Sequence, residues 1–294
     1  PRPSMRFGLV IPVGAVGSLT DPAAAVLEAE AAGFDLALLT GDAGEPAQAL
    51  TAASFVADRT HALRIVASAP VGGHPIHIAE QAAVADNALS GRLVLVLTAE
   101  PGEHGERNER SPLGETVEVV LAAFAPRPFT HDGTRWTVPG RIAGNVSDAR
   151  ISITPKPAQL ELPVWVSGAD ASAVSAEFGV SYLASDDDGP DQAEEAWTTI
   201  ERGLRRSAAR LRRPAIRALD CTPSGEFDDT AVTARLTEEA ARWGLDVVLF
   251  ALPERLEAPA RRRAIGRLAS VVRPHLQMDR VPEHVEAYWR RSRS

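Results

Sequence analysis

The chain has 294 residues, of which 45% are hydrophobic and 24% charged, with a formal net charge of −8 at pH 7. This length allows two domains, but an α/β barrel of about 250 residues forms a single one. The acidic balance argues against a general nucleic-acid binder. No apolar run approaches the roughly 20 residues that cross a membrane. One cysteine and no visible signal peptide lead us to expect a cytoplasmic protein.

Short apolar runs rich in β-forming residues recur along the whole chain. Eight of them are found, at 7–12, 36–39, 64–68, 92–97, 164–167, 181–185, 216–221 and 247–251. Most are continuous hydrophobic runs, which are typical of parallel strands covered on both faces. We therefore expect each run to be a strand of one parallel sheet.

Amphipathic helical patterns lie between these strands. They cover 21–34, 46–57, 74–91, 111–124, 191–211, 230–245 and 261–272, and a further helix-like run follows residue 170. Alternation of strand and helix eight times predicts a (β/α)8 TIM barrel over residues 5–276, with 277–294 as a C-terminal extension. A doubly wound open sheet is the alternative. Residues 127–141 predict a hairpin insertion between the fourth and fifth strands, around Asp132-Gly133.

The stretch "VWVSGADASA" at 164–173 ends a strand in a turn of very small residues. Small residues leave backbone N–H groups open, and the start of a helix points several of them at one place, where a phosphate could bind. The alternative is a tight turn capped by Asp170 or a serine. On the fragment alone the capped turn is the favoured interpretation, and the rest of the chain has to decide.

The other strand ends carry small and weakly polar residues. No strand-end histidine, GxSxG, GxGxxG or P-loop motif is present. His74 and His77 are three residues apart on a helix, but no third ligand is spaced for a metal, and we predict none. A site with few titratable groups suits a flat organic cofactor that brings its own chemistry.

Four segments, in the right order, resemble luciferase-like monooxygenases. They are "EAEAAGFDLALLTGD" (28–42), "HPIHIAEQAAVADNALSGRLVLVL" (74–97), "FTHDGTRWTV" (129–138) and "LPVWVSGADASAVSAEFGVSYLAS" (162–185). The resemblance runs from about Phe7 to about Ala184. It implies a flavin-type cofactor, reduced FMN or alternatively a deazaflavin, and hydride transfer or oxygen insertion into a medium-sized organic substrate. The strong bias to arginine over lysine, together with this resemblance, leads us to expect a role in bacterial secondary metabolism.

The resemblance also implies where the cofactor lies. The ring would rest near the ends of strands one to four, and the phosphate would sit in the turn after strand five. The cofactor-binding residues carried over are Pro12, Ser68, Ala69, Thr98, Ser167, Gly168, Ala169, Asp170 and Ser172. A non-prolyl cis peptide is implied at Ser68-Ala69. His74 and Asp42 are the candidate catalytic residues, and for His74 a packing role at the helix start is equally open.

The sequence departs from the family pattern at the proposed site. Strand four has Val96, Thr98 and Glu100 where the family has glycines, Asp170 adds a negative charge to the phosphate turn, and no histidine follows Asp42. These departures keep open a barrel that has lost flavin binding and acts as a flavin-free enzyme, a partner subunit or a binding protein. The resemblance further implies a homodimer through the alanine-rich helices 46–57 and 74–90. Because the sequence has no nicotinamide fingerprint, we expect a separate flavin reductase as the electron source.

Overall fold

The computed structural model describes residues 5–14, 19–41, 47–99, 111–140, 149–186, 188, 190–204, 211–253 and 256–278. Eight parallel strands form one sheet in the order β8-β7-β4-β3-β2-β1-β10-β9. Their bounds are β1 Arg6–Pro12, β2 Leu36–Thr40, β3 Arg64–Pro70, β4 Leu93–Ala99, β7 Val164–Gly168, β8 Ser181–Tyr182, β9 Pro214–Ala218 and β10 Val247–Ala251.

A parallel bridge between Ala184 and Ala215 joins the two edges of this sheet. The N–H of Ile216 donates to the carbonyl of Ala184 at 2.8 Å, so the sheet closes into a barrel. The predicted TIM barrel is therefore confirmed, and the open doubly wound sheet is excluded. The seventh strand lies at 214–218 and not at 216–221, because its pairing with β10 begins at Pro214 and Val247.

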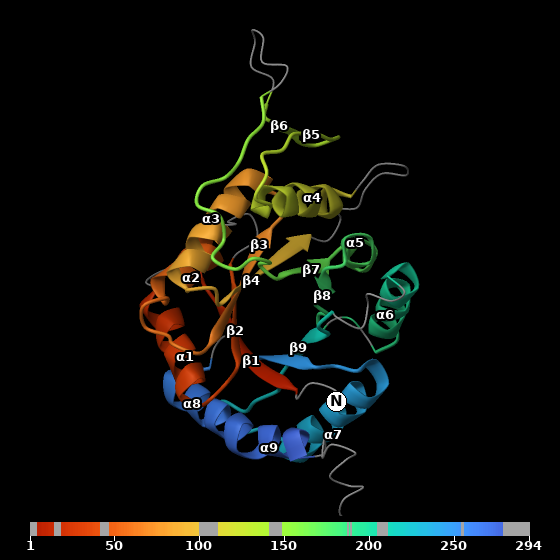
Figure 1. The fold of residues 1–294 in the computed structure, drawn as a ribbon. Helices are drawn as coiled ribbons and strands as arrows, with labels where there is room; N and C mark the ends of the chain where they lie inside the picture. The colour runs from red at the N-terminus through yellow and green to blue at the C-terminus, as the bar shows by residue number, and fades with distance from the viewer. Residues whose placement is uncertain are drawn as a thin grey trace, which may run out of the picture.

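The helices form a ring outside the strands (Figure 1). Their bounds are α1 Thr20–Ala31, α2 Ala47–Phe55, α3 Pro75–Ala88, α4 Pro112–Phe124, α5 Ala171–Phe178, α6 Pro190–Leu204, α7 Asp229–Trp243, α8 Ala258–Arg267 and α9 Arg273–Met278. A π-helical turn, Leu268–Val272, connects α8 and α9. None of the helices in the described part of the chain has the length and apolar character to cross a membrane.

Two apolar clusters follow from the alternation of side chains along each strand. One fills the barrel with residues such as Leu38, Val66, Val96, Trp165 and Leu249. The larger one lies between the strands and the helices and takes the intervening residues of the same strands. Continuous apolar strands are thus explained, since both faces of each strand are buried.

A two-stranded antiparallel sheet, β5 His131–Asp132 and β6 Thr137–Val138, stands out from the ring of helices (Figure 1). It follows α4, and its turn comprises residues 133–136. The buried carboxylate of Glu115 on α4 accepts hydrogen bonds from the backbone N–H groups of Arg135 and Trp136. Burial alone would raise the pKa of Glu115, but these bonds and the one to His131 lower it overall. A charged side chain on α4 therefore organises the turn.

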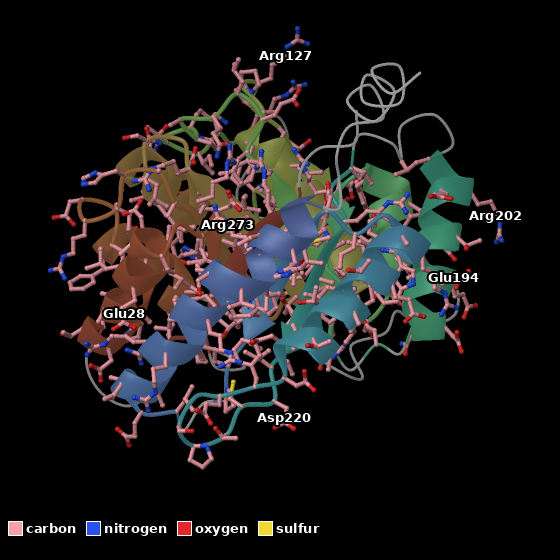
Figure 2. All side chains as sticks on the ribbon, turned by 90° about the horizontal axis from the view of Figure 1, so that it is seen from below. Glu28, Arg127, Glu194, Arg202, Asp220 and Arg273 are labelled. Carbon is pink, nitrogen blue, oxygen red and sulfur yellow. The ribbon has the colours of Figure 1, made fainter. Side chains whose placement is uncertain are left out.

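The barrel end opposite the strand carboxyl ends is held by a further carboxylate, that of the half-buried Glu30. In Figure 2, Arg127, which follows α4, and Asp220, which follows the carboxyl end of β9, lie at opposite ends of the molecule. Glu30 on α1 accepts hydrogen bonds from the backbone N–H groups of His61, Ala62 and Leu63 at 2.7–2.9 Å. The carboxylate thereby fixes the chain that enters β3.

Glu30 makes the stability depend on pH. Burial alone would raise its pKa, but the three N–H donors stabilise the carboxylate and lower the pKa overall. A lowered folded-state pKa contributes stability above the unfolded pKa of about 4.3, and this is lost as pH falls through the folded value. In Glu30→Gln, the free energy of unfolding is therefore expected to fall less steeply than in wild type as the pH is lowered below about 4.3. The measurement is urea titration at successive pH values. Exposed Glu161→Gln controls for loss of one charge, and an unchanged acid limb in Glu30→Gln would contradict this assignment.

Candidate functional site

The strand carboxyl ends surround a small cavity of about 190 Å³ inside the barrel. Six of its lining residues are small, and the other four are the apolar Leu38, Val96, Leu183 and Ile216. The lining residues are Leu38, Thr40, Gly41, Ser68, Pro70, Val96, Thr98, Ser167, Leu183 and Ile216. Parallel strands bring these residues together because their carboxyl ends meet at one edge of the barrel.

A second cavity, of about 640 Å³, surrounds the turn between β7 and α5. It shares Thr98 and Ser167 with the first cavity, so the two adjoin at the ends of β4 and β7. Ser167, Gly168, Ala169, Asp170 and Ser172, the predicted phosphate turn, all line it. The hydroxyl of Ser167 donates to the carbonyl of Leu183 at 3.1 Å and ties β7 to the chain after β8.

Gly168 is required by the packing of the barrel itself. Its φ is +87°, and a Cβ at this position would lie 2.1 Å from the carbonyl oxygen of Ala99. Ala99 is its register partner on β4. The smallness of this turn residue is therefore explained by the approach of β4, whether or not a ligand binds.

Asp170 occupies the N-cap position of α5 with a φ of 58°, in the left-handed region. Its side chain makes no capping hydrogen bond to the helix, while its carbonyl accepts from the N–H of Val174 at 3.0 Å. The first N–H groups of a helix have no partner within it. The proposed capping role of the Asp170 side chain is thus not found, and the start of α5 faces the 640 Å³ cavity without it.

The electrostatics of this cavity are acidic. Asp170, Asp188 and Glu195 line it, and no lysine, arginine or histidine does so among the residues that the structure describes. Asp188 accepts hydrogen bonds from the hydroxyl of Tyr182 at 2.8 Å and from the N–H of Ser185 at 2.7 Å. Burial, followed by the charge of Asp188, raises the pKa of the Tyr182 hydroxyl. Tyr182 therefore stays a neutral donor, and its bond offsets part of the charge of Asp188.

Four residues singled out from the sequence, three of them predicted site residues, lie elsewhere or outside the description. Pro12 lines a different cavity, of about 350 Å³, between β1, α1 and α8. Ala69 is fully buried in the outer apolar cluster, because alternate residues of β3 face opposite sides and Ser68 takes the inward position. Asp42 and Glu100 lie outside the described residues.

The peptide bond between Ser68 and Ala69 is trans. Among the described residues, the cis bonds are Val138-Pro139 and Thr154-Pro155. Ser68 and Ala69 pair in register with Val96 and Leu97, and the ladder continues to Pro70 and Thr98. The implied non-prolyl cis peptide is therefore not present, since β3 stays regular through this bond.

His74 has a structural position. It is the N-cap of α3, and its Nδ1 accepts a hydrogen bond from the N–H of Ile76 at 3.2 Å. Its ring packs edge-on against Trp136 of the hairpin, with the centroids 4.8 Å apart. Burial, with the nearby His77, lowers the pKa of His74. Among the described residues His74 lines neither mouth cavity, and no group of three His, Cys, Asp or Glu side chains could hold a metal.

Thr40 and Tyr182 are polar wall residues of the cavities that were not predicted as site residues. Thr40 ends β2, and Tyr182 lies on the two-residue strand β8. Thr40 carried a usable signal, because it is a polar residue at the end of an apolar strand. Tyr182 carried none, since its role depends on Asp188, six residues later in an irregular segment.

The "HPIHIAEQAAVADNALSGR" segment supplies structural contacts. Asp86 on α3 is fully buried and accepts hydrogen bonds from the N–H of Leu93 and from both the backbone and the side-chain amide of Gln159. Arg92 donates to the carbonyls of Ala57, Thr60 and Leu63. These residues hold the amino ends of β3 and β4, which lie at the opposite end of the strands from the mouth. This resemblance motif therefore reflects the scaffold.

Similar folds are found among solved structures. The crystal structure of monooxygenase RslO1 from Streptomyces bottropensis has a TM-score of 0.71 at 16% identity, covering 92% of this chain and 99% of that one. The coenzyme F420-dependent tetrahydromethanopterin reductase from Methanopyrus kandleri has a TM-score of 0.72 at 14% identity, covering 93% and 100%. The oxygenating constituent of 3,6-diketocamphane monooxygenase from Pseudomonas putida, solved with FMN, has 0.68 at 12%, covering 92% and 98%. At these identities the likeness is one of fold.

A comparison with curated protein sequences gave no match. The model of the luciferase-like monooxygenase family, in contrast, matches residues 5–283. This range includes all eight strands of the barrel and both mouth cavities. The chain therefore belongs to the luciferase-like monooxygenase family.

Proposed function

We propose that this protein is a flavin-dependent monooxygenase or oxidoreductase that acts on a medium-sized organic substrate. Reduced FMN is the proposed cofactor, and a deazaflavin is the alternative. The observation that supports this most is the pair of adjoining cavities. Together they connect the barrel mouth, with its small polar residues, to the start of α5. A flat ring with a phosphate-bearing tail needs this combination of a narrow slot and a helix start.

The residues present fit such a group in two respects. Thr40, Ser68, Thr98 and Ser167 give the mouth short polar walls. The start of α5 has no side-chain cap from Asp170, so its N–H groups and helix dipole are available to an anion. A bound flavin would supply the redox chemistry, and this chain would bind it, orient it and keep water from the ring.

Asp170 works against a phosphate in the same cavity, which gives a direct prediction. Two unit charges 4 Å apart in water interact by about 1 kcal/mol, or about fivefold in Kd. Asp170→Asn is therefore expected to tighten reduced-FMN binding about fivefold, measured by anaerobic fluorescence titration. Asparagine keeps the shape and tolerates the left-handed φ of 58°. Glu177→Gln, an exposed charge change on the same helix, is the control, and equal affinities of Asp170→Asn and wild type would contradict a phosphate at this turn.

A barrel without flavin is the second candidate. The mouth cavity of about 190 Å³ is smaller than ligand pockets of about 300–1,000 Å³. Val96 and Thr98 occupy the strand end where the family pattern has glycines, and the outer cavity is acidic. This candidate predicts that Asp170→Asn changes nothing, because no cofactor binds to either form.

The predicted homodimer and the separate reductase remain proposals. Most alanines of α2 and α3 are buried in the core of their own barrel, namely Ala49, Ala52, Ala53, Ala79, Ala82, Ala83 and Ala85. The same two helices nevertheless expose Phe55 and Val84, by 37% and 50%. Apolar residues of this kind on adjacent helices support a contact with a second copy.

Val84→Glu is therefore expected to convert a dimer into monomers, measured by sedimentation velocity. The charge would be buried without a partner in the contact, which is unfavourable. Ala234→Glu is the control, because Ala234 is exposed on α7 and belongs to neither of these two helices. A monomeric wild-type protein, or a dimer that Val84→Glu leaves intact, would contradict this contact.

A further inference from the structure

The amino end of the barrel, opposite the mouth, carries three arginines on alternate strands. Arg6 begins β1, Arg64 begins β3, and Arg212 lies two residues before β9. In the sheet order, β2 separates β1 from β3, and β10 separates β1 from β9. Side chains from alternate strands meet in one layer of a (β/α)8 barrel. The fold therefore brings these three residues toward the same end of the barrel interior.

Arg6 and Arg64 face the inside of the barrel and not the helices. Residues two apart on a strand share a face. Val66 belongs to the interior apolar cluster and Ile65 to the outer one, so Arg64 faces inward with Val66. Arg6 pairs in register with Val247 of the interior cluster, which gives its side chain the same direction. Both side chains thus lie at the amino end of the barrel interior, away from the mouth cavities.

These two arginines have no anionic partner in the part of the chain that the structure describes. Neither guanidinium group makes a hydrogen bond or an ion pair there. Both residues are half-buried, so each charge has lost part of its water but stays accessible. Burial lowers the pKa of Arg64, and the charge of Arg6 lowers it further. The two guanidinium groups are therefore close enough to repel each other, and the pair lacks a counter-ion.

The carboxylates at this end of the barrel are held by other donors. Asp246 accepts from Arg212 Nη1 at 3.0 Å and from the backbone N–H of the next residue at 2.7 Å. Asp35 accepts from a backbone N–H of β1 at 3.0 Å. Asp86 raises the pKa of Arg64, against the effect of Arg212, but is itself fully buried among backbone and amide donors. The inward guanidinium groups are thus left to an anion from solution.

We propose that this end of the barrel binds a phosphate group, as the free ion or as a phosphate monoester, between Arg6 and Arg64. Arg212, whose side chain is 35% exposed, lies at the edge of the site. A guanidinium group presents parallel N–H donors that match two phosphate oxygens. A phosphate carries about −1.5 to −2 charge at pH 7, so it balances both unpaired arginines where a single carboxylate would not. The site lies at the opposite end of the strands from both mouth cavities and does not rest on flavin binding.

Calorimetry on the full chain tests this site. Sodium phosphate and glycerol 3-phosphate are titrated separately, with sodium acetate as the comparison anion and sodium chloride holding the ionic strength constant. Arg64→Gln and Arg6→Gln each remove one guanidinium group, while Arg64→Lys keeps the charge without the planar fork. Arg202→Gln is the matched control, because Arg202 is an exposed arginine that projects outward from α6 (Figure 2).

The expected result is saturable binding of phosphate or of the monoester with a Kd of about 1 mM or tighter. Arg64→Gln and Arg6→Gln should each weaken it about tenfold or more, because a charge-assisted hydrogen bond is lost. Arg64→Lys should weaken it less, and Arg202→Gln should not change it. Phosphate should also raise the urea midpoint of wild type and Arg202→Gln above that in chloride of equal ionic strength, but not the midpoint of Arg64→Gln.

Three results would overturn the proposal. The first is the absence of saturable binding for both phosphate and glycerol 3-phosphate. The second is an acetate affinity equal to that for phosphate, since the site is assigned to a doubly charged group. The third is an unchanged affinity in both Arg64→Gln and Arg6→Gln, which would place the bound anion elsewhere, such as at the β7–α5 turn.

Discussion

Gly168→Ala is expected to destabilise the protein by about 3 kcal/mol or more, because the change adds backbone strain and a collision with β4. The φ of +87° disfavours any residue with a Cβ, and the new atom would lie 2.1 Å from the carbonyl oxygen of Ala99. That oxygen belongs to the backbone of β4 and cannot rotate away as a flexible side chain would. We expect a lower midpoint in urea unfolding and loss of any ligand bound at the β7–α5 turn.

Gly72→Ala is the matched control for this change. Gly72 follows β3 at the same end of the barrel, and no atom lies within 4 Å of a Cβ built there. It should therefore unfold at nearly the wild-type urea concentration. Equal midpoints for Gly168→Ala and Gly72→Ala would show that β4 and β7 are further apart than described here.

Asp86→Ala is expected to have an effect of similar size, about 3 kcal/mol. The fully buried carboxylate accepts from Leu93 N–H at 3.3 Å and from Gln159 at 2.9 Å (backbone) and 2.8 Å (side chain). Each buried donor left without a partner costs about 1–3 kcal/mol, and relaxation of Gln159 toward water recovers part of this. The measurement is the free energy of unfolding at neutral pH.

Asp58→Ala serves as the control for the Asp86 variant. Asp58 is 85% exposed at its side chain, and its ion pair with Arg59 is 4.0 Å long. An exposed pair of this kind contributes little. A loss in Asp86→Ala no larger than in Asp58→Ala would mean that Asp86 does not anchor the loop at Gln159.

The architecture was readable from the sequence because its strands are covered on both faces. Continuous apolar runs at 36–39 and 247–251 became β2 and β10, and the alternation with helices required a barrel. The seventh strand was predicted to begin two residues too late, because Pro214, which starts it, is a residue that strands disfavour. The bridge at Ala184 that completes the barrel has no pattern in the sequence.

The site was readable only in part. Ser68, Thr98 and Ser167 do line one cavity, because strand ends meet in a parallel barrel, while their role in cofactor binding stays a prediction. Ala69 was misplaced, since a one-residue step along a strand reverses the side-chain direction. For His74, sequence left a packing role and a catalytic role equally open, and only the contact with Trp136 and the cap at Ile76 reveal its structural role.

The measurement that tests the central claim most directly is an anaerobic titration of the purified protein with reduced FMN, and in parallel with a reduced deazaflavin, followed by fluorescence. Our account predicts saturable binding of one of them with a Kd below about 10 μM, tightened by Asp170→Asn. Failure of both to bind wild-type protein and Asp170→Asn would contradict the claim and leave a luciferase-like barrel without flavin.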